Sequence, residues 1–221
     1  YGIDFAENYT ASISYGTAFK APTFNELYFP NYGNPYLDPE ESESVEIGLD
    51  ADHDWGRWSL HAYQTEIDDL IAYDAATFGP ANIQETRIRG AEASLGTTIA
   101  EWQLNTQFTW LEAENRTDGA DRGNDLPRRP GYSAQFDVDR AFGRYSAGAS
   151  LTLADSSYDD LANQNELDSY QLVDLRAAMD VARDWRLQAQ LNNVFDEDYE
   201  TARFYNQADR NVFFTLRYQP Q

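Results

Sequence analysis

The sequence lacks cysteine altogether and has one methionine and two histidines among its 221 residues. Without cysteine there are no disulfides, no thiolate nucleophiles and no cysteine-ligated zinc. Basic residues are also few, with 16 Lys and Arg against 38 Asp and Glu, so the net charge is −22. This balance argues against a nucleic-acid partner, because phosphate binding needs clustered Lys and Arg.

The sequence also lacks a long apolar run. No segment approaches the ~18–20 residues that a transmembrane helix requires, which excludes a helical membrane protein. The chain opens on Tyr1-Gly2-Ile3 with no initiator Met and no signal-peptide pattern, so we expect an upstream portion. The mean hydropathy of −0.68 is low, but the aromatic content of 14% opposes disorder. A transmembrane β-barrel remains compatible, because only alternate residues of its strands must be apolar.

What the sequence does have is an alternation of apolar and polar residues with period two. From Trp102 to Trp110 every second residue faces one side as a mainly apolar stripe with Trp at both ends, and polar residues lie between. The alternation predicts about ten strands of membrane-crossing length. In one of them the phase slips near Gln64 to Ile67, which predicts a β-bulge there. Besides Trp102 to Trp110, the predicted strands are the nine segments 9–15, 45–49, 58–71 (which contains the phase slip), 91–99, 132–138, 145–153, 173–181, 185–191 and 212–218.

The predicted connections are alternately short and long. The short turns are Asp52–Arg57, Ala100–Glu101, Ala141–Arg144 and Ala182–Asp184, and the long polar loops are Lys20–Ser42, Asp74–Asn82, Glu112–Arg129, Asp155–Asp168 and Asp196–Asp209. Placing every long loop at one end is typical of outer-membrane barrels, which have short periplasmic turns and long extracellular loops. We therefore predict an all-β, antiparallel transmembrane β-barrel, with a soluble β-sandwich as the alternative.

Five local motifs, in order along the chain, resemble those of TonB-dependent outer-membrane receptors. They are Phe19–Tyr28 (FKAPTFNELY), Gly33–Glu40 (GNPYLDPE), Arg87–Glu92 (RIRGAE), Leu126–Pro130 (LPRRP) and Leu191–Tyr199 (LNNVFDEDY). The resemblance implies that residues 1–221 form one domain, the C-terminal portion of a 22-stranded barrel, with the plug domain absent. It also implies a location in the outer membrane, contact with its lipid, and coupling to the TonB complex through the missing N-terminal part. Against the family pattern, Tyr218 is followed by Gln219-Pro220-Gln221 instead of ending the chain.

Within this family the sequence is most similar to the cobalamin transporter branch, which implies uptake of cobalamin bound by extracellular loops. Two alternatives stay open, namely a ferric-siderophore receptor of the same family and a structural or adhesive barrel without transport. No cofactor is expected. The parent branch binds calcium, but the strands whose loops carry its ligands are not in this segment.

The candidate site residues lie on or beside the long loops. By resemblance, Arg128 and Tyr158 fall where cobalamin transporters contact their substrate. Exposed loop aromatics suit a large amphipathic ligand, with packing between loops as the alternative, and these are Tyr28, Tyr32, Tyr73, Phe204 and Tyr205. Acidic clusters at Asp155–Asp160 and Asp196–Glu200 lack calcium-loop spacing and are expected to be solvated. We expect no enzyme, because neither His53 nor His61 has a serine and a carboxylate placed for a triad.

Overall fold

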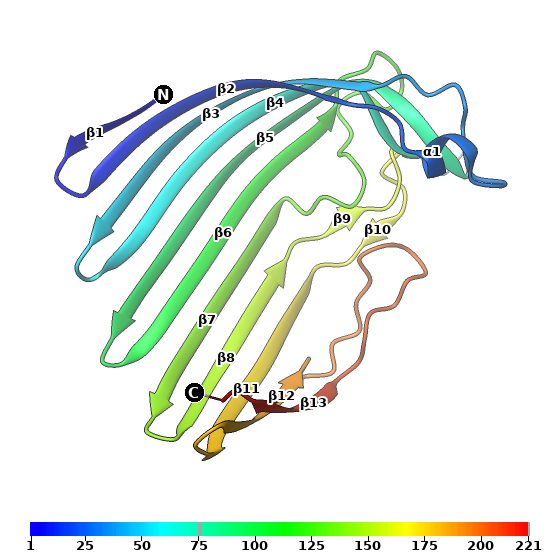
Figure 1. Cartoon of the computed structure of the whole chain (residues 1–221). Coiled ribbons are helices and arrows are strands. Elements are labelled where there is room, and N and C mark those ends of the chain that lie inside the picture. Colours follow the sequence, from blue (N-terminus) through cyan, green and yellow to red (C-terminus); the bar gives the residue numbers. More distant parts are fainter. Residues whose placement is uncertain (75–76, 221) are drawn as a thin grey trace.

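The computed structural model describes residues 1–74 and 77–220 and consists of one large curved antiparallel sheet (Figure 1). Eleven strands form this sheet in the order β1-β2-β3-β4-β5-β6-β7-β8-β11-β12-β13, so every strand pairs with its neighbour in the sequence apart from the detour through β9 and β10. A separate two-stranded sheet is formed by β10 and β9. The predicted all-β antiparallel architecture is confirmed, with one more strand in the large sheet than the approximate number expected.

The strands lengthen towards the middle of the sheet. Their bounds are β1 Gly2–Ala6, β2 Tyr9–Lys20, β3 Glu40–His53, β4 Gly56–Asp74, β5 Gly79–Ile99, β6 Trp102–Asn115, β7 Tyr132–Phe142, β8 Tyr145–Ala154, β9 Ser157–Tyr158, β10 Glu166–Leu167, β11 Tyr170–Ala182, β12 Trp185–Asn192 and β13 Asn211–Tyr218. Within the described residues, β1 and β13 are the edges of the large sheet, which is open.

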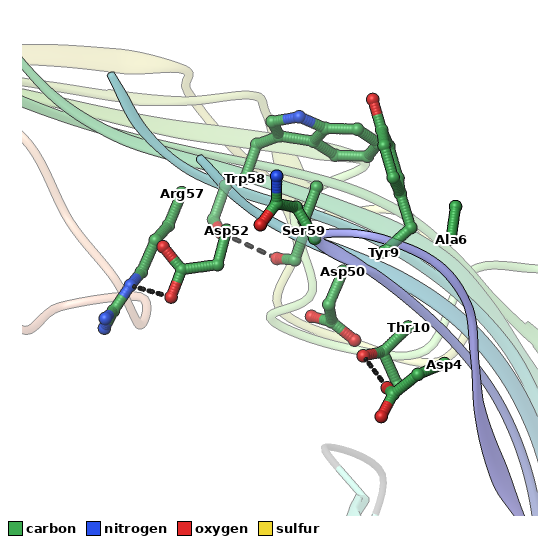
Figure 2. Close-up of a pocket in the computed structure, with 12 residues that line it drawn as sticks. Asp4, Ala6, Tyr9, Thr10, Asp50, Asp52, Arg57, Trp58 and Ser59 are labelled. Carbon is green, nitrogen blue, oxygen red and sulfur yellow. Dashed lines mark hydrogen bonds and ion pairs between the residues drawn. The ribbon is translucent and has the colours of Figure 1, made fainter. Parts of the chain in front are cut away.

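The period-two alternation divides the sheet into an apolar and a polar face, because successive side chains of a strand point to opposite sides. Two adjacent cross-strand rows illustrate the contrast. One row runs Ile47–Ala62–Ala91–Trp110–Tyr132, and the next runs Gly48–His61–Glu92–Thr109–Ser133. Close to the short turns, Figure 2 shows Tyr9 and Trp58 on one side of the sheet and Thr10 and Asp50 on the other. The apolar side chains are exposed along their face, as a lipid-facing surface requires.

Strands β4 and β5 extend well beyond the apolar band, and here two predictions were wrong. The β4–β5 register is continuous through Gln64 to Ile67 and is the same at Leu70 to Asp74, so no β-bulge lies there, although Asp69 has a positive φ of 56°. The apolar alternation changes phase in the sequence because Ile67 lies on the polar face. There it packs against a small apolar cluster of Leu70, Ile83, Ala113 and Leu126. The loop expected from Asp74 to Asn82 is instead a tight connection, since β5 resumes at Gly79; residues 75–76 lie outside the described part.

A short helix, α1 (Phe24–Tyr28), was not predicted. It begins with a capping box in which the Glu26 amide donates to Thr23 Oγ1 at 3.3 Å and the Thr23 amide donates to Glu26 Oε2 at 2.6 Å. With five residues it is too short to show an amphipathic stripe. Across residues 1–74 and 77–220, no helix has the length and apolar character needed to cross a bilayer.

Candidate ligand-binding site

The long connections of the chain gather at one end of the sheet and the tight turns lie at the other (Figure 1). The long connections are residues 21–39, 116–131, 155–169 and 193–210. Apart from the β4–β5 connection, this is the predicted alternation of long and short segments. The candidate site is therefore at the loop end.

The loop after β6 folds back onto the polar face and is anchored there by Leu126. This side chain has 0% exposure and packs with Leu70, Ile83 and Ala113. Its amide donates to the Ala113 carbonyl at 2.8 Å, which fixes the backbone beside β6. Burying a leucine side chain contributes about 2 kcal/mol, so this contact holds the following residues, including Arg128, close to the sheet.

Arg128 lies at the centre of the contacts made by this loop. Its Nε donates to Asp159 Oδ1 at 2.6 Å, and its guanidinium carbon lies 5.7 Å from the centre of the Tyr73 ring. Its amide donates to the Tyr158 carbonyl at 2.6 Å. Arg128 thus links its own loop to the connection after β8 and to the end of β4, and no hydrogen bond from its Nη atoms is present in the described part.

Asp159 joins a third loop to the same point. It is buried, with a side-chain exposure of 12%, and its Oδ1 also accepts the Arg203 amide at 3.2 Å. The Arg203 guanidinium donates to Asn165 Oδ1 and lies 4.8 Å from the centre of the Phe204 ring. The loops after β6, β8 and β12 are consequently tied together around one carboxylate.

The neighbouring carboxylate, Asp160, closes its own loop. It accepts the amides of Gln164 at 3.1 Å and Asn165 at 2.8 Å. Burial opposes ionisation of this group, but these hydrogen bonds outweigh it and hold the pKa of Asp160 below its ordinary value. The expectation that the cluster Asp155–Asp160 is solvated was therefore wrong for Asp159 and Asp160, which are buried and hydrogen-bonded.

The aromatic residues of the loop before β3 form a second group. Phe24 and Tyr28 lie 5.2 Å apart between ring centres, and Phe29 and Tyr32 lie 6.3 Å apart. The chain turns so sharply here that a Cβ on Gly33 would lie 2.6 Å from the Tyr28 amide nitrogen. This close approach explains the glycine of the GNP motif.

Paired hydrogen bonds link this loop to the β4–β5 hairpin. Asn82 Oδ1 accepts the Asp38 amide at 2.9 Å, and Asn82 Nδ2 donates to the Asp38 carbonyl at 3.0 Å. Asn34 Nδ2 donates to the Pro80 carbonyl at 3.3 Å. The second aromatic group is thereby held at the same end of the sheet as Tyr73.

The structure brings some predicted site residues together and leaves others apart. Arg128, Tyr158 and Tyr73 meet directly, and Phe204 joins them through Arg203. In the part of the chain that the structure describes, no hydrogen bond or ring contact joins Arg128 to the predicted residues Tyr28, Tyr32 and Tyr205, and Tyr205 is 70% exposed. Asp159, Asn165 and Arg203 were not predicted as site residues, because their roles depend on contacts between loops far apart in the chain.

The polar face carries a second cluster, around His61, that was considered as an alternative centre of chemistry. His61 lies between Glu46 Oε1 at 3.1 Å and Asp50 Oδ1 at 3.3 Å, and within the residues described no serine is hydrogen-bonded to it. Nor does the described part contain three or more His, Cys, Asp or Glu side chains grouped to hold a metal ion. This arrangement provides two carboxylates around an imidazole but no nucleophile.

A hollow close to the short turns, drawn in Figure 2, is also unsuited to a large ligand. Its three aspartates are already engaged, since Asp4 accepts Thr10 Oγ1 at 2.6 Å, Asp50 faces His61 and Asp52 pairs with Arg57 at 2.9 Å. The loop end therefore remains the candidate site.

The sequence matches the family described as TonB dependent receptor-like, beta-barrel, over residues 2–194. A vitamin B12 transporter, BtuB of Photobacterium profundum, is 37% identical over 215 residues, covering 94% of this chain and 35% of the relative. BtuB of Vibrio cholerae is 31% identical, covering 99% of this chain and 36% of the relative. The chain thus spans about a third of the length of these curated relatives.

Solved structures agree on the fold. The siderophore receptor PiuA from Acinetobacter baumannii superposes with a TM-score of 0.81 at 23% identity, covering 99% of this chain and 35% of that one. The copper transporter OprC superposes with a TM-score of 0.80 at 19% identity, covering 98% of this chain and 38% of that one. On the sequence match and the identity to the BtuB relatives, this chain belongs to the TonB-dependent receptor family, as part of its β-barrel.

Proposed function

We propose that the protein takes up cobalamin across the outer membrane by TonB-dependent transport. The observation that carries this proposal is the alignment of nearly the whole chain with vitamin B12 transporters at 37% identity. The contacts around Arg128 support it, because the Tyr73 ring offers aromatic surface beside this cation at the end where the ligand arrives. No bond is made or broken in this function, so the protein acts as a receptor and transporter rather than an enzyme.

In this mechanism the apolar face meets lipid and the polar face lines the lumen. A charge on the lumen face costs little, whereas Arg or Lys at the lipid midplane costs about 2–4 kcal/mol. The ligand is first captured by the extracellular loops, which the contacts around Asp159 hold in a defined arrangement. Binding a ligand on loops that are already ordered loses less conformational entropy than ordering them on contact. Energy for release into the periplasm comes from the TonB complex.

The proposal is tested by titrating the protein, expressed from its complete gene in outer-membrane vesicles, with cobalamin and with ferric siderophores. We expect saturable binding of cobalamin and no competition by the ferric chelates. Arg128→Gln should weaken binding, while Arg122→Gln, in the same loop but paired with the exposed Asp118, should not. Preference for a ferric chelate would replace cobalamin by a siderophore, and binding of neither would favour a structural barrel.

A further inference from the structure

One arginine lies on the face of the sheet that is otherwise apolar. Arg140 of β7 is paired with Trp102 of β6, and the same face continues along these strands to the row of Trp110 and Tyr132. In the described strands β6, β7 and β8, Arg140 carries the only charge on this face between those two rows. Because aromatic residues mark the two membrane interfaces of a barrel, Arg140 lies at the interface of the short-turn end.

Two aromatic rings hold the Arg140 guanidinium against the sheet. Its central carbon lies 5.5 Å from the centre of the Trp102 ring and 4.9 Å from that of the Phe142 ring, distances at which an aromatic face attracts a cation. Within the part of the chain described, Arg140 Nε is buried and has no hydrogen-bond partner. With Nε enclosed, the Nη end of this half-buried side chain is the part that meets its surroundings.

The turn between β5 and β6 brings a carboxylate to the same point. Glu101 Oε2 accepts Arg140 Nη2 at 2.6 Å, and the Glu101 side chain is 75% exposed. Ala100 and Glu101 have positive φ angles of 49° and 69°, in a two-residue turn where glycine or asparagine is usual. In the described structure neither Glu101 Oε1 nor Arg140 Nη1 has a hydrogen-bond partner. The pair therefore offers one free acceptor and one free donor.

A second arginine lies at the end of the neighbouring hairpin. Arg144, in the β7–β8 turn, is exposed, and its guanidinium carbon lies 5.5 Å from the centre of the Tyr145 ring. Among the described residues, its guanidinium makes no hydrogen bond and no ion pair. The β6–β7 pairing places the two hairpins next to each other at this end of the sheet (Figure 1). Two cations and one carboxylate consequently lie at this interface of a chain whose net charge is −22.

We propose that Glu101, Arg140 and Arg144 bind the headgroup of a phospholipid that carries a primary amine. The two guanidinium groups donate to its phosphate, which arginine recognises well. The phosphate adjoins the acyl chains and the ammonium lies beyond it, in the same order as Arg140 on the apolar face and Glu101 in the turn. Glu101 accepts the ammonium, because its free oxygen has room for a further donor. This site lies away from the loop end and does not depend on which ligand the loops bind.

Native mass spectrometry of the protein, expressed from its complete gene and solubilised in detergent, measures this binding as the affinity for the first lipid added. Phosphatidylethanolamine should bind about five-fold more tightly than phosphatidylglycerol or phosphatidylcholine with the same acyl chains. Arg140→Gln and Arg144→Gln should each weaken both phosphatidylethanolamine and phosphatidylglycerol by about five-fold. Glu101→Gln should weaken phosphatidylethanolamine alone. Arg183→Gln, exposed in the β11–β12 turn, is the matched control and should alter neither lipid.

Arg144→Gln separates a binding role from a structural one. Arg140→Gln also removes the ion pair with Glu101 and can weaken the fold, whereas Arg144 has no ion pair within the described protein. Arg144→Gln should therefore keep the unfolding midpoint of the wild type while it loses lipid affinity. Equal affinity for all three lipids, an equal loss of both lipids in Glu101→Gln, or a loss in Arg183→Gln as large as that in Arg144→Gln would each overturn the assignment.

Discussion

Replacing Leu126 by alanine should release the loop that carries Arg128 while leaving the sheet intact. Truncating a buried leucine costs 2–5 kcal/mol in a closed core. The cluster around Leu126 is small, with Leu70, Ile83 and Ala113 as its other buried members, and it lies at the end of the sheet, so the site can partly collapse. We therefore expect about 2–3 kcal/mol, which raises the open population of the loop roughly 30- to 150-fold.

Amide hydrogen exchange measures this opening directly. The amides of residues 126 and 128 are the reporters, because they donate to the carbonyls of Ala113 at 2.8 Å and Tyr158 at 2.6 Å. Their exchange should accelerate in Leu126→Ala while strand amides keep their protection. Leu187→Ala, on the exposed apolar face, is the control and should leave the loop unchanged. Unchanged loop exchange, or equal acceleration throughout the sheet, would refute the anchoring role of Leu126.

Three further predictions concern the two faces of the sheet, the loop that Asp160 closes and the turn at Gly33. Phe108→Arg should destabilise the membrane-inserted barrel by roughly 2–4 kcal/mol in a denaturant titration, and Gln107→Arg on the opposite face should be nearly neutral; equal effects would contradict the face assignment. Folding lowers the pKa of Asp160, so the ionised carboxylate stabilises its loop at every pH above the ordinary aspartate pKa. This stabilisation is lost as the pH falls through the lowered pKa of the folded protein. Exchange at residue 165 in an acid titration should therefore show opening only in that acidic range, and Asp160→Asn should abolish this dependence. Gly33→Ala should disturb the aromatic loop, since its Cβ would meet the Tyr28 amide at 2.6 Å, and limited proteolysis should cut that loop faster.

The membrane-spanning part of the fold could be predicted from the sequence, because lipid imposes a strict alternation on every strand. Trp102 to Trp110 keeps its phase from end to end, and the structure places that stripe on one face. Beyond the apolar band this constraint disappears. At Gln64 to Asp68 the outward side chains are polar, and Ile67 on the opposite face packs beside Leu70, Ile83, Ala113 and Leu126, so the alternation changed phase although the strand pairing did not.

The candidate site was only partly predictable for a related reason. Arg128 and Tyr158 were predicted from the family resemblance, and the loop aromatics were predicted from their residue type and their place in the long loops. The role of Asp159 depends on three connections meeting at one carboxylate, which no local pattern records. The helix α1 is different, because the spacing of Thr23 and Glu26 is a recognisable capping box and could have indicated it.

We propose that the loop end of this sheet is the extracellular, ligand-binding end of an outer-membrane receptor. Single cysteines at Gln164, in the loop between β9 and β10, and at Arg183, in the β11–β12 turn, test it most directly, since both residues are exposed and residues 1–221 contain no cysteine. A membrane-impermeant thiol reagent applied to intact cells should label position 164, and cobalamin should slow this labelling. Position 183 should react only after the outer membrane is opened and should not respond to cobalamin. Labelling of position 183 on intact cells, or protection of both positions alike, would contradict the account.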